Sequence, residues 1–180
     1  MSVSREQVIL VDAQDNPVGA MEKLAAHREG ALHRAFCIFV FDRAGRLLLQ
    51  RRALGKYHSG GLWTNTCCSH PRPGETVAAA ARRRLNEEMG IDCRLDRRFS
   101  FRYRADLPNG LVEHELAHVL FGRFDGEPRL NPDEADDWRY APLASVKQQV
   151  AAQPNDFTAW FKIVLPKVDR ARDELNGGEA

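Results

Sequence analysis

Apolar and polar residues alternate with a period of two over several short stretches, and this pattern predicts a protein built around a β-sheet. The chain is almost continuously apolar over 35–41, and a second expected strand covers 46–50, with three leucines between Arg46 and Gln50. The residues between these runs, Asp42-Arg43-Ala44-Gly45, form a typical hairpin turn. A turn is also expected at Asp15-Asn16-Pro17. Further strands are expected over 8–11, 97–104 and 111–124.

Helical spacing appears in the second half of the chain. At about 100° per residue, Val77, Ala81, Leu85 and Glu88 fall in one narrow stripe. This stripe predicts a helix over 75–89, which Gly90 is placed to end. We also expect helices over 143–151 and 156–174, and a short helix or ordered loop over 21–27.

Strands come before, between and after the helices without regular alternation, and this order favours an α+β (mixed α/β) fold. We expect a mixed or mainly antiparallel sheet flanked by helices, in a single domain that spans 1–180. One segment, 51–73, is rich in Gly, Ser, His and Cys and has no clear period. Segments of that length without periodicity are more often functional than structural.

Two glutamates on a predicted strand are the first candidates for chemistry. Glu113 and Glu115 project to one face, which continues as Ala117, Val119 and Phe121. Neighbouring carboxylates on a face that becomes apolar are costly unless a cation or proton lies between them. A solvated strand end is the alternative. His114 and His118 point to the opposite face, where packing or surface roles are expected.

Three further histidines, His27, His33 and His70, lie in segments predicted as loops or strand edges. Histidine and carboxylate together are usual ligands of manganese, zinc or iron. With Glu113 and Glu115 they could complete a site of three histidines and two glutamates. Their spacing alone does not prove that they converge, and each could be structural.

Anion binding would depend on local clusters of cations. Glu88 ends the apolar stripe of the 75–89 helix, where the helix dipole disfavours a carboxylate, so a compensating cation is expected. One turn of the basic run Arg82-Arg83-Arg84 could reach a phosphate. Further cations near the long polar segment are either phosphate ligands or a solvated set: Lys23, Arg51, Arg52 and Lys56. A Walker loop and a Gly-x-Gly-x-x-Gly motif after a strand are both absent.

Composition narrows the class of protein. The chain has 180 residues, enough for one sizeable core, and its net charge of +1 excludes a strongly basic nucleic-acid or membrane-surface protein. The longest apolar run, 35–41, is too short to span a bilayer. The first residues lack the basic-then-apolar pattern of a signal peptide. We therefore expect a cytoplasmic protein without an obligate protein partner.

The four cysteines form neither a disulfide framework nor a Cys-x-x-Cys pair. Cys37 lies inside the apolar run and is expected to pack in the core, as is Cys93. Cys67 and Cys68 stand apart, because the segment around them is polar and contains His70.

Three segments carry a resemblance to a known family: Thr64-Asn65-Thr66-Cys67-Cys68-Ser69-His70-Pro71, Pro73-Gly74-Glu75 and Arg83-Arg84-Leu85-Asn86-Glu87-Glu88-Met89-Gly90. Together they resemble the active-site stretch of type I isopentenyl diphosphate isomerases, a branch of the Nudix fold family. Other residues that agree are Lys23, His27, His33, Arg52, Lys56, Tyr103, Glu113, Glu115 and Trp160. The likeness runs from about residue 8 to about residue 170.

The departures from the hydrolytic members of that family are informative. A hydrolytic Nudix box would begin with glycine at Ser69 and would carry a glutamate at Arg84. Replacement of a metal-binding glutamate by arginine argues for a repurposed box. Ser69 also departs from the glycine common in the isomerases. Within Cys-x-His-Pro, position selects Cys68 over Cys67.

The resemblance implies that the enzyme shifts the double bond between isopentenyl and dimethylallyl diphosphate. It implies one divalent ion, Mn²⁺ or Mg²⁺ with Zn²⁺ possible, held by His27, His33, His70, Glu113 and Glu115. Cys68 is counted with this set as a metal-binding residue. Glu88 would help bind a second ion, Mg²⁺, that bridges to the substrate diphosphate. The residues facing the phosphates would be Lys23, Arg52, Lys56 and Arg84.

By the same resemblance, Cys68 and Glu115 would be the acid and base on opposite sides of the substrate, in an order that depends on the direction of reaction. Tyr103 would tune Glu115, and Trp160 would stabilise a tertiary carbocation with its aromatic face. Two alternatives stay open. One is a Nudix hydrolase of a nucleoside or prenyl diphosphate, and the other is a binding module with structural zinc.

Overall fold

The computed structural model describes residues 6–177, with side chains to residue 173. Its strands are β1 (Gln7–Val11), β2 (Pro17–Glu22), β3 (His33–Phe41), β4 (Leu47–Arg52), β5 (Trp63–Thr64), β6 (Cys67–Ser69), β7 (Leu95–Asp106), β8 (Val112–Arg123) and β9 (Ala135–Ala141). Its helices are α1 (Lys23–Glu29), α2 (Val77–Met89), α3 (Leu143–Ala152) and α4 (Ala159–Gly177), with short 3₁₀ turns at Pro108–Gly110 and Pro154–Asp156.

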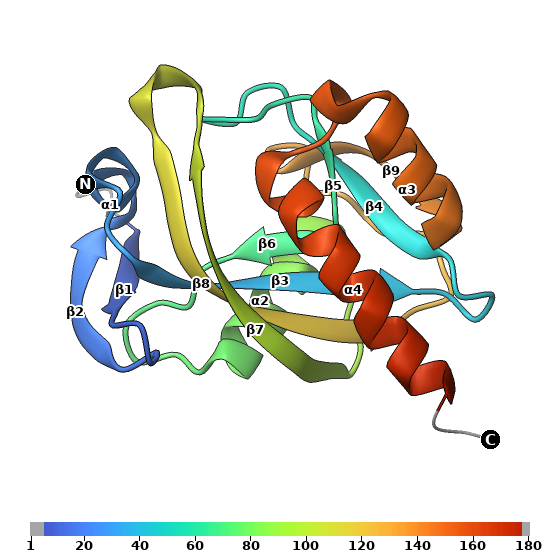
Figure 1. Cartoon of the computed structure of the whole chain (residues 1–180), viewed down its shortest axis with the longest axis horizontal. Coiled ribbons are helices and arrows are strands. Elements are labelled where there is room, and N and C mark those ends of the chain that lie inside the picture. The colour runs from blue at the N-terminus through green and yellow to red at the C-terminus, as the bar shows by residue number, and fades with distance from the viewer. Residues whose placement is uncertain (1–5, 178–180) are drawn as a thin grey trace.

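The nine strands form one mixed sheet in which β3 has a central place (Figure 1). β3 pairs in parallel with β8 over nine residue pairs, from His33 opposite Glu115 to Phe41 opposite Arg123. Its other pairings, with β1, β4 and β6, are antiparallel. β7 and β8 form a long antiparallel hairpin, and β9 extends the sheet beside β4. The prediction of an α+β fold with a mixed sheet is confirmed.

β3 is buried on both faces, which explains its nearly continuous apolar sequence. Its odd-numbered residues, such as Cys37 and Phe39, belong to a core with Trp160, Phe161 and other residues of α3 and α4. Its even-numbered residues, such as Phe36 and Ile38, pack against α2. α2 and α4 therefore cover opposite faces of the sheet, and α4 crosses the near face in Figure 1.

Most predicted elements exist within one to three residues of their predicted bounds. α2 begins at Val77 and not at residue 75, because the Thr76 hydroxyl accepts a hydrogen bond from the Ala79 N–H and caps the helix. Gly90 ends it in the left-handed conformation, with φ 63°. α4 begins at Ala159 and not at residue 156, since a 3₁₀ turn and the bridge of Phe157 to Trp63 precede it.

The sequence analysis missed four strands. β2 is largely exposed, and β9 carries adjacent charges, so neither shows a clean alternation. β5 and β6 are only two and three residues long and lie inside the polar segment 51–73. β6 matters most for the site, because it presents Cys68 at the edge of β3.

Candidate active site

A cavity opens at the end of the sheet where β3, β6 and β8 meet α1 and the 52–62 loop. Counted out to its mouth, with the open solvent there included, the space is about 450 Å³. Its lining includes every predicted catalytic and phosphate-facing residue: Lys23, Arg52, Lys56, Cys68, Arg84, Tyr103, Glu115 and Trp160. Side chains far apart in the sequence are thus gathered around one space.

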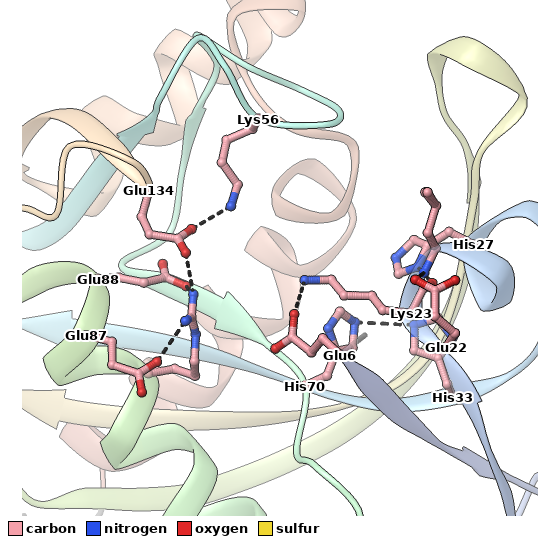
Figure 2. A network of polar contacts seen from close by, with 12 residues as sticks. Glu6, Glu22, Lys23, His27, His33, Lys56, His70, Glu87, Glu88 and Glu134 are labelled. Atoms are coloured by element: carbon pink, nitrogen blue, oxygen red, sulfur yellow. Dashed lines mark hydrogen bonds and ion pairs between the residues drawn. The ribbon is translucent and has the colours of Figure 1, made fainter. Parts of the chain in front are cut away.

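The three predicted histidines converge with one glutamate at the inner end of this cavity. Ligand atoms of His27, His33, His70 and Glu115 all lie within 4.8 Å of one another, and all four side chains are buried. His33 and Glu115 are brought together by the β3–β8 register, while His70 follows β6. The Nε2 atoms of His33 and His70 are 3.3 Å apart (Figure 2). His70 Nε2 also lies 2.9 Å from Glu115 Oε1.

The backbone around α1 sets the direction in which two of these rings point. Nδ1 of His27 donates to the carbonyl of Lys23 at 2.7 Å, and Nδ1 of His33 donates to that of Ala31 at 2.8 Å. This tautomer, inferred from the hydrogen bonds, leaves both Nε2 lone pairs facing the cluster. Gly30, with φ 64°, makes the reversal between α1 and β3 that brings the two rings to 4.9 Å.

These residues fit a divalent ion on chemical grounds. His27 Nε2 is buried and has no hydrogen-bond partner among the described residues. Burial lowers the pKa of His27, and lowers that of His70 to about 4, so both imidazoles are neutral at neutral pH. Neutral imidazoles with inward lone pairs beside a carboxylate are what a transition-metal ion requires.

Glu113 and Glu115 form a coupled carboxyl pair beneath the histidines. The Tyr103 hydroxyl lies 2.9 Å from Glu113 Oε2 and 2.8 Å from Glu115 Oε2. Burial and the charge of Glu115 raise the pKa of Glu113 well above its usual range. Burial also opposes ionisation of Glu115, but its close contacts with His33 and His70 hold its pKa well below the usual range. The two carboxyls therefore differ in how readily they ionise.

His58 was missed by the sequence analysis. It is 5% exposed, its Nε2 lies 3.6 Å from Glu113 Oε1, and it forms a second potential ligand group with His27 and Glu113. Burial, with the nearby charge of Arg52, lowers its pKa to about 3. Its place in a Gly/Ser-rich loop gave no periodic signal that could have indicated it.

Cys68 faces the cavity, whereas Cys67 does not. On β6, Cys67 lies against α2 with no exposed surface, and Cys68 packs on the opposite face beside the α4 core. The Asn65 amide donates a hydrogen bond to Cys68 Sγ at 3.0 Å. It also donates to the carbonyl of Ile38 at 3.0 Å, and this second bond anchors the Asn65 side chain to β3. Asn65 is therefore a further site residue, and its place in the Thr-Asn-Thr-Cys-Cys motif could have indicated it.

Three of the four predicted phosphate-facing cations are already paired with carboxylates, and Arg52 is the exception. Arg84 lies 2.6 Å from Glu88 and 2.9 Å from Glu134, and Lys56 lies 2.5 Å from Glu134. Figure 2 shows Lys56, Glu134 and Glu88 along this chain of ion pairs. Burial lowers the pKa of Arg84, but the charge of Glu88 and the bond to Glu134 more than reverse the effect. Arg84 is the compensating cation that Glu88 was expected to need.

On the other side of the cavity, Lys23 pairs with Glu6 at 3.1 Å. The Arg52 guanidinium lies 5.2 Å from the Trp160 ring centroid and donates to the carbonyl of His58 at 3.2 Å. Trp160 is 2% exposed, and its ring meets the edge of His58 at a centroid distance of 5.7 Å. An aromatic wall and a cation thus adjoin each other in the cavity.

Other candidates lie elsewhere. His118 is buried beside Asp15 at 2.9 Å, and His114 donates to the carbonyl of Gly30. Neither histidine lines the cavity, as expected for packing residues. The side chains of Arg51, Arg82 and Arg83 bind Asp136, Asp92 and Glu75 respectively.

Comparison with known proteins decides the family. The NUDIX domain family model matches residues 31–161. Isopentenyl-diphosphate Delta-isomerase 2 of Aromatoleum aromaticum is 58% identical over 175 residues, which cover 97% of this chain and 92% of that protein. The isopentenyl-diphosphate Delta-isomerase of Pectobacterium atrosepticum is 51% identical, with 90% of each chain covered. The chain belongs to the isopentenyl-diphosphate Delta-isomerase family within the NUDIX proteins.

Solved structures agree on the fold. The DR0079 protein of Deinococcus radiodurans matches with a TM-score of 0.77 at 20% identity, over 90% of this chain and 98% of that one. A MutT protein from Methanosarcina mazei matches with a TM-score of 0.64 at 17% identity, over 78% and 95%. In this protein, Arg84 lies on α2 and forms an ion pair with Glu88 of the same helix.

Proposed function

We propose that this protein interconverts isopentenyl and dimethylallyl diphosphate by moving one double bond. The observation that carries the proposal is the shared cavity, which both the Cys68 thiol and the Glu115 carboxylate line. Cys68 lies on β6 and Glu115 on β8, and both of these strands pair with β3. The names of relatives at 51–58% identity support the same reaction.

The reaction adds a proton to the terminal alkene carbon and removes one from the carbon on the other side of the branched carbon. A tertiary carbocation forms between the two steps. Cys68 and Glu115 are the two proton-transfer groups, and their roles exchange with the direction of reaction. Asn65 orients the thiol, and Tyr103 holds the carboxylate, at the distances given above.

A buried ion would be held by His27, His33, His70, Glu113 and Glu115. When bound, it supplies positive charge that offsets the two carboxylates and fixes Glu115 in place. Three imidazoles with carboxylates suit Mn²⁺ or Zn²⁺ better than Mg²⁺, which prefers oxygen ligands. We therefore favour Mn²⁺ at this site and assign Mg²⁺ to the substrate diphosphate beside Glu88.

Lys23, Arg52, Lys56 and Arg84 recognise the diphosphate. Glu6, Glu134 and Glu88 keep Lys23, Lys56 and Arg84 in place until the substrate and its Mg²⁺ exchange with these ion pairs. The carbonyl of His58 holds Arg52. The Trp160 face then borders the five-carbon group and stabilises its cation without capturing it. Exclusion of water from this buried wall protects the cation from hydration.

The partner implied is this small prenyl diphosphate, with neither nucleic acid nor membrane involved. Within residues 6–177, we find no helix long and apolar enough to cross a bilayer. We propose a single catalytic domain acting in the cytoplasm.

The deciding experiment incubates the metal-loaded protein with isopentenyl diphosphate and separates dimethylallyl diphosphate from released phosphate. The isomer is expected, and Cys68→Ala and Glu115→Gln should each abolish its formation, whereas Cys67→Ala retains it. Release of phosphate would instead identify a hydrolase. If the fully metal-loaded protein forms neither product, the result would favour the alternative of a binding module without catalytic activity.

A further inference from the structure

A second thiol lies directly against Cys68. Cys37 and Cys68 are opposite each other in the antiparallel pair of β3 and β6, so their side chains share one face of the sheet. Their Sγ atoms are 3.1 Å apart. Cys37 is 1% exposed, whereas Cys68 is half-buried and lines the cavity.

We propose that Cys37 and Cys68 are an oxidative modification site, a thiol pair that closes to an intramolecular disulfide. Opposite Cα atoms of antiparallel strands are about 4.5 or 5.5 Å apart, and both values lie inside the usual disulfide range of about 4.4–6.8 Å. The sulfurs need to approach by about 1 Å to reach a bond of about 2.05 Å. Rotation of the two side chains supplies that movement without a shift of the strands.

The oxidant is a peroxide, which enters through the cavity mouth and meets Cys68 first. The Cys68 sulfur attacks hydrogen peroxide, gains one oxygen as a sulfenic acid and releases water. The Cys37 sulfur then displaces that hydroxyl, and a second water leaves. Two thiols and one peroxide thus give one disulfide and two waters, with sulfur oxidised and peroxide oxygen reduced.

The other cysteines are poorly placed to compete. Cys67 is adjacent in sequence, and the 3.8 Å between neighbouring Cα atoms is below the usual disulfide range. Its side chain also lies on the opposite face of the sheet, beneath α2. Cys93 packs in the same α2 core as Cys67. Cys37 is therefore the partner that captures an oxidised Cys68.

Disulfide formation would remove the Cys68 thiol from the cavity and protect it from further oxidation. The expected loss of turnover depends on the proposed function, because that function makes Cys68 a proton-transfer group. The disulfide itself depends only on the geometry of β3 and β6. The two claims can therefore fail separately.

The test treats the metal-loaded protein with hydrogen peroxide and follows both mass and isomerase turnover. We expect a loss of about 2 Da, a non-reduced peptide that joins Cys37 to Cys68, and at least a tenfold fall in turnover. Dithiothreitol should restore both the mass and the rate. Cys67→Ala protein should behave in the same way, since its remaining pair is unchanged.

Cys37→Ser is the matched variant, because it replaces the second thiol with a hydroxyl of similar shape. Its turnover is measured before peroxide is added, and the effect of peroxide is expressed relative to that rate. Peroxide should drive its Cys68 to sulfinic or sulfonic acid, a gain of about 32 or 48 Da that dithiothreitol does not reverse. The proposal is overturned if Cys68 is consumed in the unmodified protein without the Cys37–Cys68 peptide. It is also overturned if Cys37→Ser recovers as fully as the parent. A linked peptide in a protein that never isomerises would refute only the proposed function.

Discussion

Removal of a single oxygen atom, by Tyr103→Phe, is the sharpest perturbation of the carboxyl pair. The hydroxyl lies 2.8 Å from Glu115 and 2.9 Å from Glu113, and the residue is 6% exposed. The remaining ring still stacks on Phe101 at a centroid distance of 5.3 Å, so packing is largely retained. A hydrogen bond to a charged group contributes about 1.5–3 kcal/mol.

If the hydrogen bond from Tyr103 strengthens as the proton moves at Glu115, its removal raises the free energy of the transition state more than that of the bound substrate. Turnover should then fall by about 10- to 150-fold, while the melting temperature changes little. The assay measures kcat and KM for isopentenyl diphosphate beside thermal unfolding and bound metal. Tyr103 contacts the carboxylates but belongs to neither group of potential metal ligands, so we expect the metal content to be unchanged.

Tyr140→Phe is the matched control. Its hydroxyl also has two acceptors, the carbonyls of Phe124 and Gly126, each at 3.1 Å, but it lies outside the cavity. It should lose a similar amount of stability without loss of turnover. Equal turnover in Tyr103→Phe and Tyr140→Phe would refute the argument that the Tyr103 hydroxyl acts on Glu115.

Three further outcomes follow from the same site. Trp160→Leu should lose about ten- to thirtyfold in turnover and Trp160→Phe less, because leucine removes the aromatic face; equal rates in folded variants would refute the role. His70→Ala should release the tightly bound ion in elemental analysis, and His58→Asn should only weaken its binding; full metal content in His70→Ala would exclude the proposed ligand set. In metal-free protein, stability should fall as pH drops from about 6.5 toward 4, because His70 and His58, with pKa values of about 4 and about 3, stay neutral when folded but gain protons when unfolded. His70 alone contributes on the order of 3 kcal/mol to this loss, and melting temperatures independent of pH over that window would contradict it.

The candidate site was predictable from sequence where local geometry decides the outcome. A period of two was enough to put Glu113 and Glu115 on one face, and a period of 3.6 pointed Glu88 inward toward a cation. The convergence of His33 with Glu115 was not predictable by spacing, because it depends on the parallel register of β3 with β8. The resemblance to a known family supplied that missing long-range information.

Residues on irregular backbone were the ones that the sequence analysis missed. His58 and Glu134 lie in loops, where no period indicates direction, and only the folded chain shows that they reach the cavity. Cys37 was expected to pack in the core, and it does. Its contact with Cys68 requires the pairing of β3 with a three-residue strand that was itself not predicted.

The chain from Lys56 through Glu134 and Arg84 to Glu88 also bears on inhibition. Its charges alternate, so the cavity mouth offers little uncompensated attraction to a bare anion. Inorganic phosphate must break these contacts without bringing a cation for the released carboxylates, and it should therefore compete weakly. Under the proposed function, a diphosphate that arrives with Mg²⁺ would exchange partners on both sides at once. We therefore expect this chain of ion pairs to favour the magnesium-bound substrate over a bare anion.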